Sequence, residues 1–192
     1  MRKTILVIAL FALASFQTQD RVTIDKEEAK KAFQLLNDIR ANPSKYYNEL
    51  HFDKNFIVST TPLVWNDTLA KVAEAKAYDM ANRNYFGHTD PDGFGINHYI
   101  QASGYKLNSD WTKNKTDNFF ESITAQASGG ENAIKNLIID EHTPSLGHRK
   151  HLLGIGEWNA SLYDIGIGYA KRDAGSVYTT YVSVIIAKHD WK

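Results

Sequence analysis

Apolar residues recur every three or four positions near the start of the chain, the spacing of a helix with one buried face. Between residues 25 and 43, these positions are Ala29, Phe33, Leu36 and Ile39. Asp25 precedes the stripe and is a suitable N-cap, and Pro43 ends it because proline cannot continue a helix. The pattern predicts a helix between Asp25 and Pro43.

A second apolar stripe follows after a polar loop. Its members are Leu69, Val72, Ala73, Ala77 and Met80. Asn66 or Asp67 can cap its start, and we expect the helix to end near Asn84, before the turn-forming sequence FGHTDPDG. The stretch GINHYIQASGY predicts a third helix that ends at Gly104, because glycine is favoured just after a helix.

The second half of the chain changes in character. Residues 105–120 are polar and irregular and predict a loop, and a helix is expected to begin near Ser128. The C-terminal stretches LYDIGIGYA and VYTTYVSVIIAKH are rich in β-branched and aromatic residues and are separated by the turn-like KRDAGS. They predict a β-hairpin, so the chain is expected to be an α+β domain with helices on an antiparallel sheet.

The N-terminus has the pattern of an export signal. Arg2 and Lys3 precede the apolar run ILVIALFALASF, which contains the small-residue site Ala12-Leu13-Ala14. We expect residues 1–19 to be a cleaved signal peptide and residues 20–192 to be the domain. The protein is then secreted or periplasmic, with no transmembrane segment in the mature chain.

Composition narrows the possible chemistry. The 192 residues are 43% hydrophobic, with 22 basic and 22 acidic residues, which indicates one globular domain without the basic excess of a nucleic-acid-binding protein. The chain has no cysteine, which excludes disulfides, cysteine nucleophiles and thiolate metal sites.

Six carboxylates and imidazoles gather between residues 128 and 153: Glu131, Asp140, Glu141, His142, His148 and His151. Glu131 follows Ser128 by three residues, the spacing of a capping box, so its expected role is to cap the helix. Asp140 and Glu141 fall at the C-terminal end of that helix, where the dipole disfavours acids; they either serve a cation or imidazolium or are simply solvated.

The histidines leave alternatives open. His148 and His151 are three residues apart and could share a helix face, although such pairs also occur by accident on surfaces. His88 lies in a Gly/Asp/Pro turn, where an exposed or carboxylate-bonded ring is expected, and His142 is expected to face solvent.

The order of several motifs resembles the bacterial, SCP-domain branch of the CAP superfamily, which contains the cysteine-rich secretory proteins, antigen 5 and the pathogenesis-related 1 proteins. These motifs are PLVWNDTLAKVAEAKAYDMANRNYFGHTDPDG, ESITA, IIDEHTPSLGHRKHLLG and YDIGIGYA, and the likeness spans about residues 30–190. The resemblance implies a three-layer α-β-α sandwich with a cleft that holds two histidines and two acids.

Position by position, the resemblance assigns these cleft residues as His88, Glu121, Asp140 and His148, with Glu141 as the alternative second acid. Glu121 is preferred to Glu131 because the family has a loop and then a full helix between its first acid and the following Asp. The chain departs from the family pattern in Phe120, which replaces a glycine, and in Ser122, which replaces an asparagine.

The tetrad implies a site for a divalent metal ion, zinc by ligand type, with His88 and His148 as ligands and the two acids orienting them. We expect a non-enzymatic binding module for a small hydrophobic ligand or a protein partner. The alternative is a metal-assisted hydrolase or peptidase with Glu121 as general base, and a third reading is a structural factor of the cell envelope. Four aromatic residues are expected either in the core or along an apolar groove near the site: Tyr85, Phe86, Tyr99 and Trp158.

Overall fold

The computed structural model describes residues 21–173 and 175–189, so the predicted signal peptide lies outside the described residues. The helices are α1 (Lys26–Ala41), α2 (Asp67–Arg83), α3 (Ile96–Ala102), α4 (Gly130–Ile139), α5 (Gly147–Leu153) and α6 (Glu157–Ala160). The strands are β1 (Val22–Ile24), β2 (Val64–Trp65), β3 (Glu121–Ala125), β4 (Asp164–Arg172) and β5 (Thr180–Ala187). Short 3₁₀ turns occur at Pro43–Lys45 and Ser109–Thr112. Among the residues described, no helix has the length and apolar character needed to cross a membrane.

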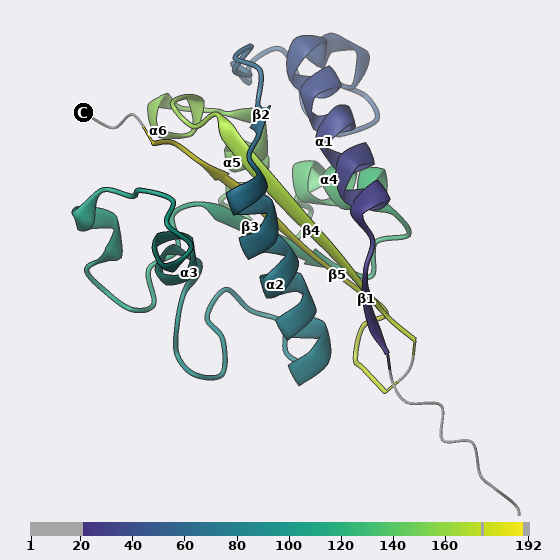
Figure 1. Ribbon diagram of the computed structural model, residues 1–192. Coiled ribbons are helices and arrows are strands. Elements are labelled where there is room, and N and C mark those ends of the chain that lie inside the picture. The colour runs from purple at the N-terminus through teal and green to yellow at the C-terminus, as the bar shows by residue number, and fades with distance from the viewer. Residues whose placement is uncertain (1–20, 174, 190–192) are drawn as a thin grey trace, which may run out of the picture.

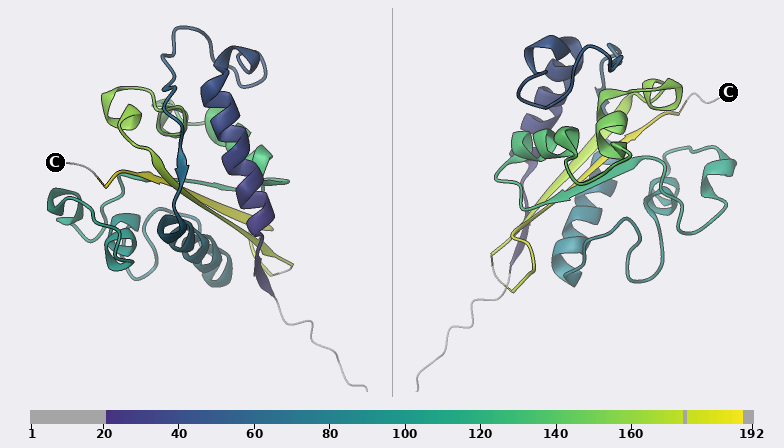
Figure 2. Two further views of the ribbon diagram at one scale, coloured as in Figure 1. Left: turned by 45° about the horizontal axis from the view of Figure 1, so that its top comes forward. Right: turned by 180° about the vertical axis from the view of Figure 1, so that it is seen from behind.

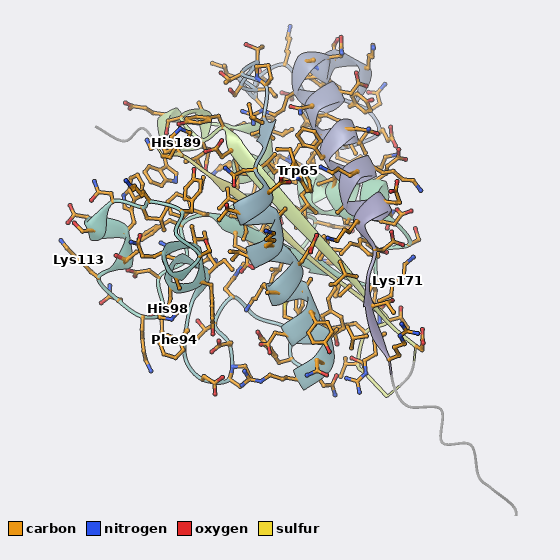
Figure 3. The ribbon with its side chains drawn as sticks, in the orientation of Figure 1. Trp65, Phe94, His98, Lys113, Lys171 and His189 are labelled. Atoms are coloured by element: carbon orange, nitrogen blue, oxygen red, sulfur yellow. The ribbon has the colours of Figure 1, made fainter. Side chains whose placement is uncertain are left out.

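The sheet has the order β1-β4-β5-β3, and its main pairs are antiparallel. The predicted hairpin is confirmed as β4 and β5, which pair from Asp164 opposite Ala187 to Lys171 opposite Thr180. The two-residue strand β2 departs from the expectation of an antiparallel sheet, because it pairs with β4 in parallel. Trp65 of this strand, which Figure 3 labels, packs edge-on against Phe33 of α1, with 5.5 Å between ring centres.

Helices cover both faces of the sheet, which confirms the α+β class and the three-layer arrangement. One face carries α2 and α3, and the other carries α1, α4 and α5 (Figure 1; Figure 2). Glycines on β4 bring α2 close to the sheet: a Cβ added at Gly166 would lie 2.2 Å from the backbone nitrogen of Ala70, and one at Gly168 would lie 2.1 Å from the carbonyl oxygen of Ala73. The central strand therefore has no side chain at these positions to hold α2 away.

The predicted helix boundaries follow from local caps. Asp25 accepts a hydrogen bond from Glu28 N at 3.1 Å, and Asn66 accepts from the backbone of the first turn of α2. Asn84 ends α2 in the left-handed conformation, with φ 56°, so the chain turns sharply into the segment that carries His88. Gly104, with φ +87°, lies just beyond α3 as expected.

The predicted capping box of Ser128 and Glu131 is wrong. The N-cap of α4 is Gly129, and Glu131 is exposed. Instead, the carboxylate of Glu28 on α1 accepts a hydrogen bond from Gly130 N at 2.6 Å. This cap from another helix is possible because α1 and α4 are very close: a Cβ at Gly130 would lie 1.8 Å from the carbonyl oxygen of Glu28.

Candidate functional site

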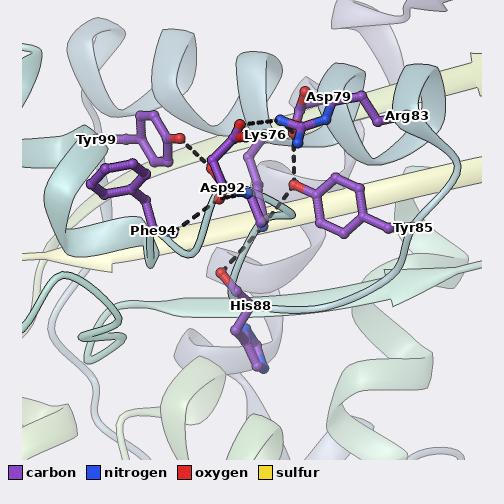
Figure 4. A network of polar contacts seen from close by, with 9 residues as sticks. Lys76, Asp79, Arg83, Tyr85, His88, Asp92, Phe94 and Tyr99 are labelled. Atoms are coloured by element: carbon purple, nitrogen blue, oxygen red, sulfur yellow. Dashed lines mark hydrogen bonds and ion pairs between the residues drawn. The ribbon is translucent and has the colours of Figure 1, made fainter.

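His88 lies in the turn after α2, and a buried lysine holds the backbone of that turn. Lys76 Nζ donates to the carbonyl oxygen of His88 at 3.2 Å and to the Tyr85 hydroxyl at 3.1 Å, and Tyr85 in turn donates to Asp79 at 2.8 Å (Figure 4). Burial lowers the pKa of Lys76, an effect that the negative charge of Glu121 partly opposes. The ammonium group of Lys76 thus holds the backbone of the segment that carries His88.

The turn itself is organised by Asp90. Its Oδ1 accepts from the backbone nitrogens of Asp92 and Phe94, both at 2.9 Å, and its Oδ2 accepts from the Tyr99 hydroxyl. Burial acts to raise the pKa of Asp90, but the hydrogen bonds outweigh it and leave the pKa below its usual value. Figure 4 shows Phe94 and Tyr99 of this network beside the ion pair of Asp92 with Arg83, whose atoms are 2.6 Å apart.

Glu121 is the first residue of β3, and its side chain is fully buried behind His88. His88 Nδ1 lies 3.0 Å from Glu121 Oε2, and Ser183 Oγ on β5 donates to Oε1 at 2.7 Å. A carboxylate accepts hydrogen bonds, so this contact favours the proton on Nδ1 of His88 and leaves Nε2 free.

Asp140 makes the matching contact on the other side of the cleft. It ends α4 in the left-handed conformation, with φ 51°, and its Oδ1 lies 2.8 Å from His148 Nδ1. Its Oδ2 accepts from the backbone nitrogens of His148 at 3.0 Å and of Arg149 at 3.3 Å. The acid at the unfavourable end of α4 therefore caps the start of α5, whose N-terminus favours negative charge.

The pKa of Asp140 reflects these contacts. Burial acts to raise it, but hydrogen bonds from His148, Thr143 and the backbone outweigh burial and leave the pKa below its usual value. Glu141, the alternative second acid, is exposed. Of the two candidates, Asp140 is the one that contacts His148.

His88, Glu121 and His148 line one cleft of about 430 Å³, together with Phe119 and Asn159 among others. Asp140 lies behind His148 and does not line the cleft itself. The ring centres of His88 and His148 are 6.4 Å apart and their planes are tilted by 37°. Each Nδ1 is held by a carboxylate, and the rings remain partly exposed, at 38% and 27%. Such a pair can present two Nε2 atoms to a ligand.

His151 does not share the exposed face of His148. It turns inward, where its Nδ1 lies 2.7 Å from Ser122 Oγ and its Nε2 is buried without a hydrogen-bond partner. Burial is the main cause that lowers the pKa of His151 to about 4, while a backbone contact with Ile186 has a smaller, opposite effect. The imidazole is therefore neutral at physiological pH, although its side chain borders the cleft.

The aromatic residues divide between different surroundings. Tyr85 and Tyr99 line a separate hollow of about 810 Å³ along α2 and α3, and Phe86 and Trp158 are 43% and 38% exposed. His142 is exposed as expected. Sequence reasoning missed the supporting roles of Lys76 and Ser183. The sequence hints at these roles only in that each is a polar residue at a position where the surrounding pattern calls for an apolar one.

Comparison with known proteins places this geometry in a family. The family model described as the Cysteine-rich secretory protein family, CAP, matches residues 58–185. The chain is a member of the CAP family. The CAP chain is 26% identical over 172 residues to protein YkwD of Bacillus subtilis (strain 168), an alignment that covers 85% of this chain and 59% of that protein. It thus spans less than two thirds of the length of this relative.

Two solved structures have a similar fold. An extracellular protein containing an SCP domain from Bacillus anthracis str. Ames has a TM-score of 0.53 and 24% identity, covering 85% of this chain and 41% of that one. An outer surface protein from Borrelia burgdorferi has a TM-score of 0.53 and 17% identity, covering 88% of this chain and 99% of that one. At these identities the likeness concerns the fold, which agrees with the three-layer arrangement of this CAP domain.

Proposed function

We propose that this CAP domain is a non-enzymatic binding module whose cleft takes a divalent ion, zinc by ligand type, between His88 and His148. The observation that carries the proposal is the pair of carboxylate–histidine contacts, Glu121 with His88 at 3.0 Å and Asp140 with His148 at 2.8 Å. Metal-bound histidines are typically oriented by a carboxylate on the other ring nitrogen, and imidazole is a preferred zinc ligand.

The spacing of the rings is wider than one tetrahedral zinc ion requires. A Zn–N bond of about 2.0–2.1 Å puts zinc roughly 3.2 Å from the centre of each ring, so two rings that share a tetrahedral ion lie about 5.2 Å apart. The observed separation is 6.4 Å, so the two rings would have to approach each other by about 1 Å on binding. Within the described residues, no set of three or more histidines and acids is arranged to enclose a metal, so water or a bound ligand would complete the coordination.

The carboxylates favour binding over hydrolysis. A general base on a metal-bound water needs a free oxygen within hydrogen-bond reach of that water. Both oxygens of Glu121 are engaged, by His88 and by Ser183, and its side chain is fully buried. We therefore assign Glu121 an orienting role rather than the catalytic role of the alternative hydrolase or peptidase.

The ion would supply a Lewis-acidic contact for the ligand of the module, a small hydrophobic molecule or a protein surface. Phe119, which is 46% exposed, lines the cleft beside the two histidines and offers an apolar contact to such a ligand. We further propose that the protein is exported, in line with the N-terminal pattern of Arg2, Lys3 and the apolar run that follows them.

A zinc titration with a hydrolysis assay tests the function. Isothermal titration of the purified domain is expected to show one zinc site, lost in the His88→Ala/His148→Ala double variant and kept in the His142→Ala control. A peptide library should remain uncleaved with zinc present. Cleavage that requires zinc and both histidines would refute the binding-only role, and absence of zinc binding in the native chain would refute the metal site. Mass spectrometry of the protein recovered from culture medium or periplasm should show removal of residues 1–19; an intact N-terminus would contradict the export proposal.

A further inference from the structure

β3 lies at one edge of the sheet. The strand order β1-β4-β5-β3 gives β3 one partner, β5, among the described residues and leaves its other edge without a strand. Figure 2 shows β3 between the layer that contains α4 and α5 and the layer that contains α2. Natural sheets commonly block such an edge with proline or with outward-pointing charges. β3 has no proline, and its one charge, Glu121, contacts His88, so the strand itself does not block pairing.

The hydrogen bonds between β3 and β5 show which backbone groups face the free edge. Phe120 O accepts from Ile186 N at 2.9 Å, and Gln126 N donates to Thr180 O at 3.1 Å. In an antiparallel pair, residues that exchange hydrogen bonds alternate along the strand, so the even-numbered residues of this stretch bond to β5. The backbone groups that point away from β5 therefore belong to the odd-numbered residues: Glu121, Ile123 and Ala125.

Two of these three residues have no partner at the free edge. Glu121 N donates to Asn118 Oδ1 at 3.2 Å, which agrees with its outward direction. No hydrogen bond among the described residues engages the outward N–H and C=O of Ile123 and Ala125. Ile123 is 6% exposed and Ala125 is half-buried. Buried backbone polar groups normally have a hydrogen-bond partner, so this edge offers two donors and two acceptors to a ligand.

The free edge continues into the cleft. Successive residues of a strand face opposite sides of the sheet, so Glu121 contacts His88, which follows α2, and Ser122 contacts His151 of α5. All four residues line the cleft together with His148. The cleft is therefore at the start of β3, where the two helix layers meet around the edge of the sheet. A chain that pairs with β3 would run directly into it.

We propose that the ligand of this binding module is an extended peptide segment of another protein, which adds to the free edge of β3 and places one side chain in the cleft. This inference rests on the proposed function, since it takes a protein rather than a small molecule as the ligand. An extended peptide presents N–H and C=O groups with the same alternation and can pair with the free groups of Ile123 and Ala125. A small apolar molecule would leave them unpaired. A single chain, at the strand spacing of about 4.8 Å, also fits an edge that is recessed between two helix layers, where a folded second copy would not reach.

Selection from a phage-displayed library of random dodecapeptides, against the purified domain with and without zinc, tests the proposal. A selected peptide is expected to protect the N–H groups of Ile123 and Ala125 from hydrogen exchange, measured by NMR. The N–H groups of Ser122 and Thr124, which bond to β5, should be protected in both states and serve as internal controls. N-methylation of the peptide residues that face β3 should weaken binding about tenfold each, and N-methylation of the residues between them should have little effect. A library that yields no binder, or a bound peptide that leaves Ile123 and Ala125 unprotected, would overturn the proposal.

A proline at position 125 tests recognition of the backbone. Ala125→Pro removes an N–H that the fold does not use, and proline is tolerated on an edge strand. This variant should bind the selected peptide at least about tenfold more weakly, whereas Ala125→Val, which keeps the N–H, should bind it as the native chain does. Unchanged binding by folded Ala125→Pro would contradict the edge interaction. If this variant does not fold, hydrogen exchange and N-methylation with the native chain still decide the question.

Zinc titration separates this inference from the proposed metal site. Zinc binding without any peptide binding would overturn only the edge interaction. Peptide binding by a chain that takes up no zinc would support the edge interaction and overturn the metal site. Sedimentation of the free domain tests the other occupant: a dimer in which Ile123 and Ala125 are already protected would show that a second copy, and not a peptide, pairs with β3.

Discussion

Because of His151, the stability of this domain falls as the pH is lowered. Its pKa is about 4 in the folded chain and its ordinary value is 6.5, so the unfolded chain binds the proton first as pH falls. The stabilisation by the neutral, buried imidazole is complete above about pH 6.5 and is lost progressively between pH 6.5 and pH 4. Linkage gives a loss of about 2 kcal/mol at pH 5 and about 3 kcal/mol at pH 4.

The variant His151→Gln isolates this contribution, because glutamine does not titrate and can still accept a hydrogen bond from Ser122. The free energy of unfolding is measured with urea and tryptophan fluorescence at several pH values between 7.5 and 4.5, for the native chain and the variant. The gap between the two proteins should shrink by about 2 kcal/mol from pH 7.5 to pH 5.

The exposed His142 provides the control, since His142→Gln should follow the native pH profile throughout. A gap between the native chain and His151→Gln that stays constant over this pH range would show that His151 titrates normally in the fold. Burial would then not be lowering the pKa of His151.

Three further substitutions test other parts of the structure. Gly166→Ala should lower Tm by about 10 °C because the added Cβ would lie 2.2 Å from the backbone of α2. Gly87→Ala, where the nearest neighbour of the added Cβ is 3.6 Å away, should leave Tm unchanged. Scanning calorimetry measures both variants, and equal effects would contradict the close packing of α2 on β4. Asp140→Ala removes the cap of α5 and the partner of His148, so urea unfolding should show a loss of about 1–2 kcal/mol and zinc titration a 10- to 100-fold loss of affinity; an unchanged zinc affinity would show that Asp140 only caps. Lys76→Met should cost about 1–3 kcal/mol in urea unfolding, because the carbonyl of His88 loses its donor; no loss would mean that the bond contributes nothing.

Local features could be predicted from the sequence because their causes lie within a few residues. The apolar stripes of α1 and α2 and their caps, Asp25 and Asn66, are of this kind. The predicted capping box of α4 is wrong because the group that caps the helix, Glu28, is 102 positions away and reaches Gly130 only through the packing of two helices. Strand β3 was missed because it begins with a buried glutamate and a buried serine, which interrupt the alternation that marks a strand.

The candidate site shows the same division. The positions of His88, Glu121, Asp140 and His148 came from a resemblance in motif order, not from periodicity. What the motifs could not indicate is which polar side chains turn inward, because a buried lysine such as Lys76 looks like a surface residue in the pattern. Its burial becomes apparent only when the turn after α2 folds back over it.

The two halves of the cleft are expected to form at different stages of folding. Asp140 and His148 are eight residues apart and are joined by the α4–α5 connection, so their contact needs little chain closure. The other half joins His88 to Glu121, 33 residues away, and Glu121 is held in turn by Ser183, 62 residues further on. Contacts between distant segments are slow to form, because the chain must close long loops before they stabilise anything. The His148 half can therefore assemble early, and the cleft becomes complete only when β3 pairs with β5.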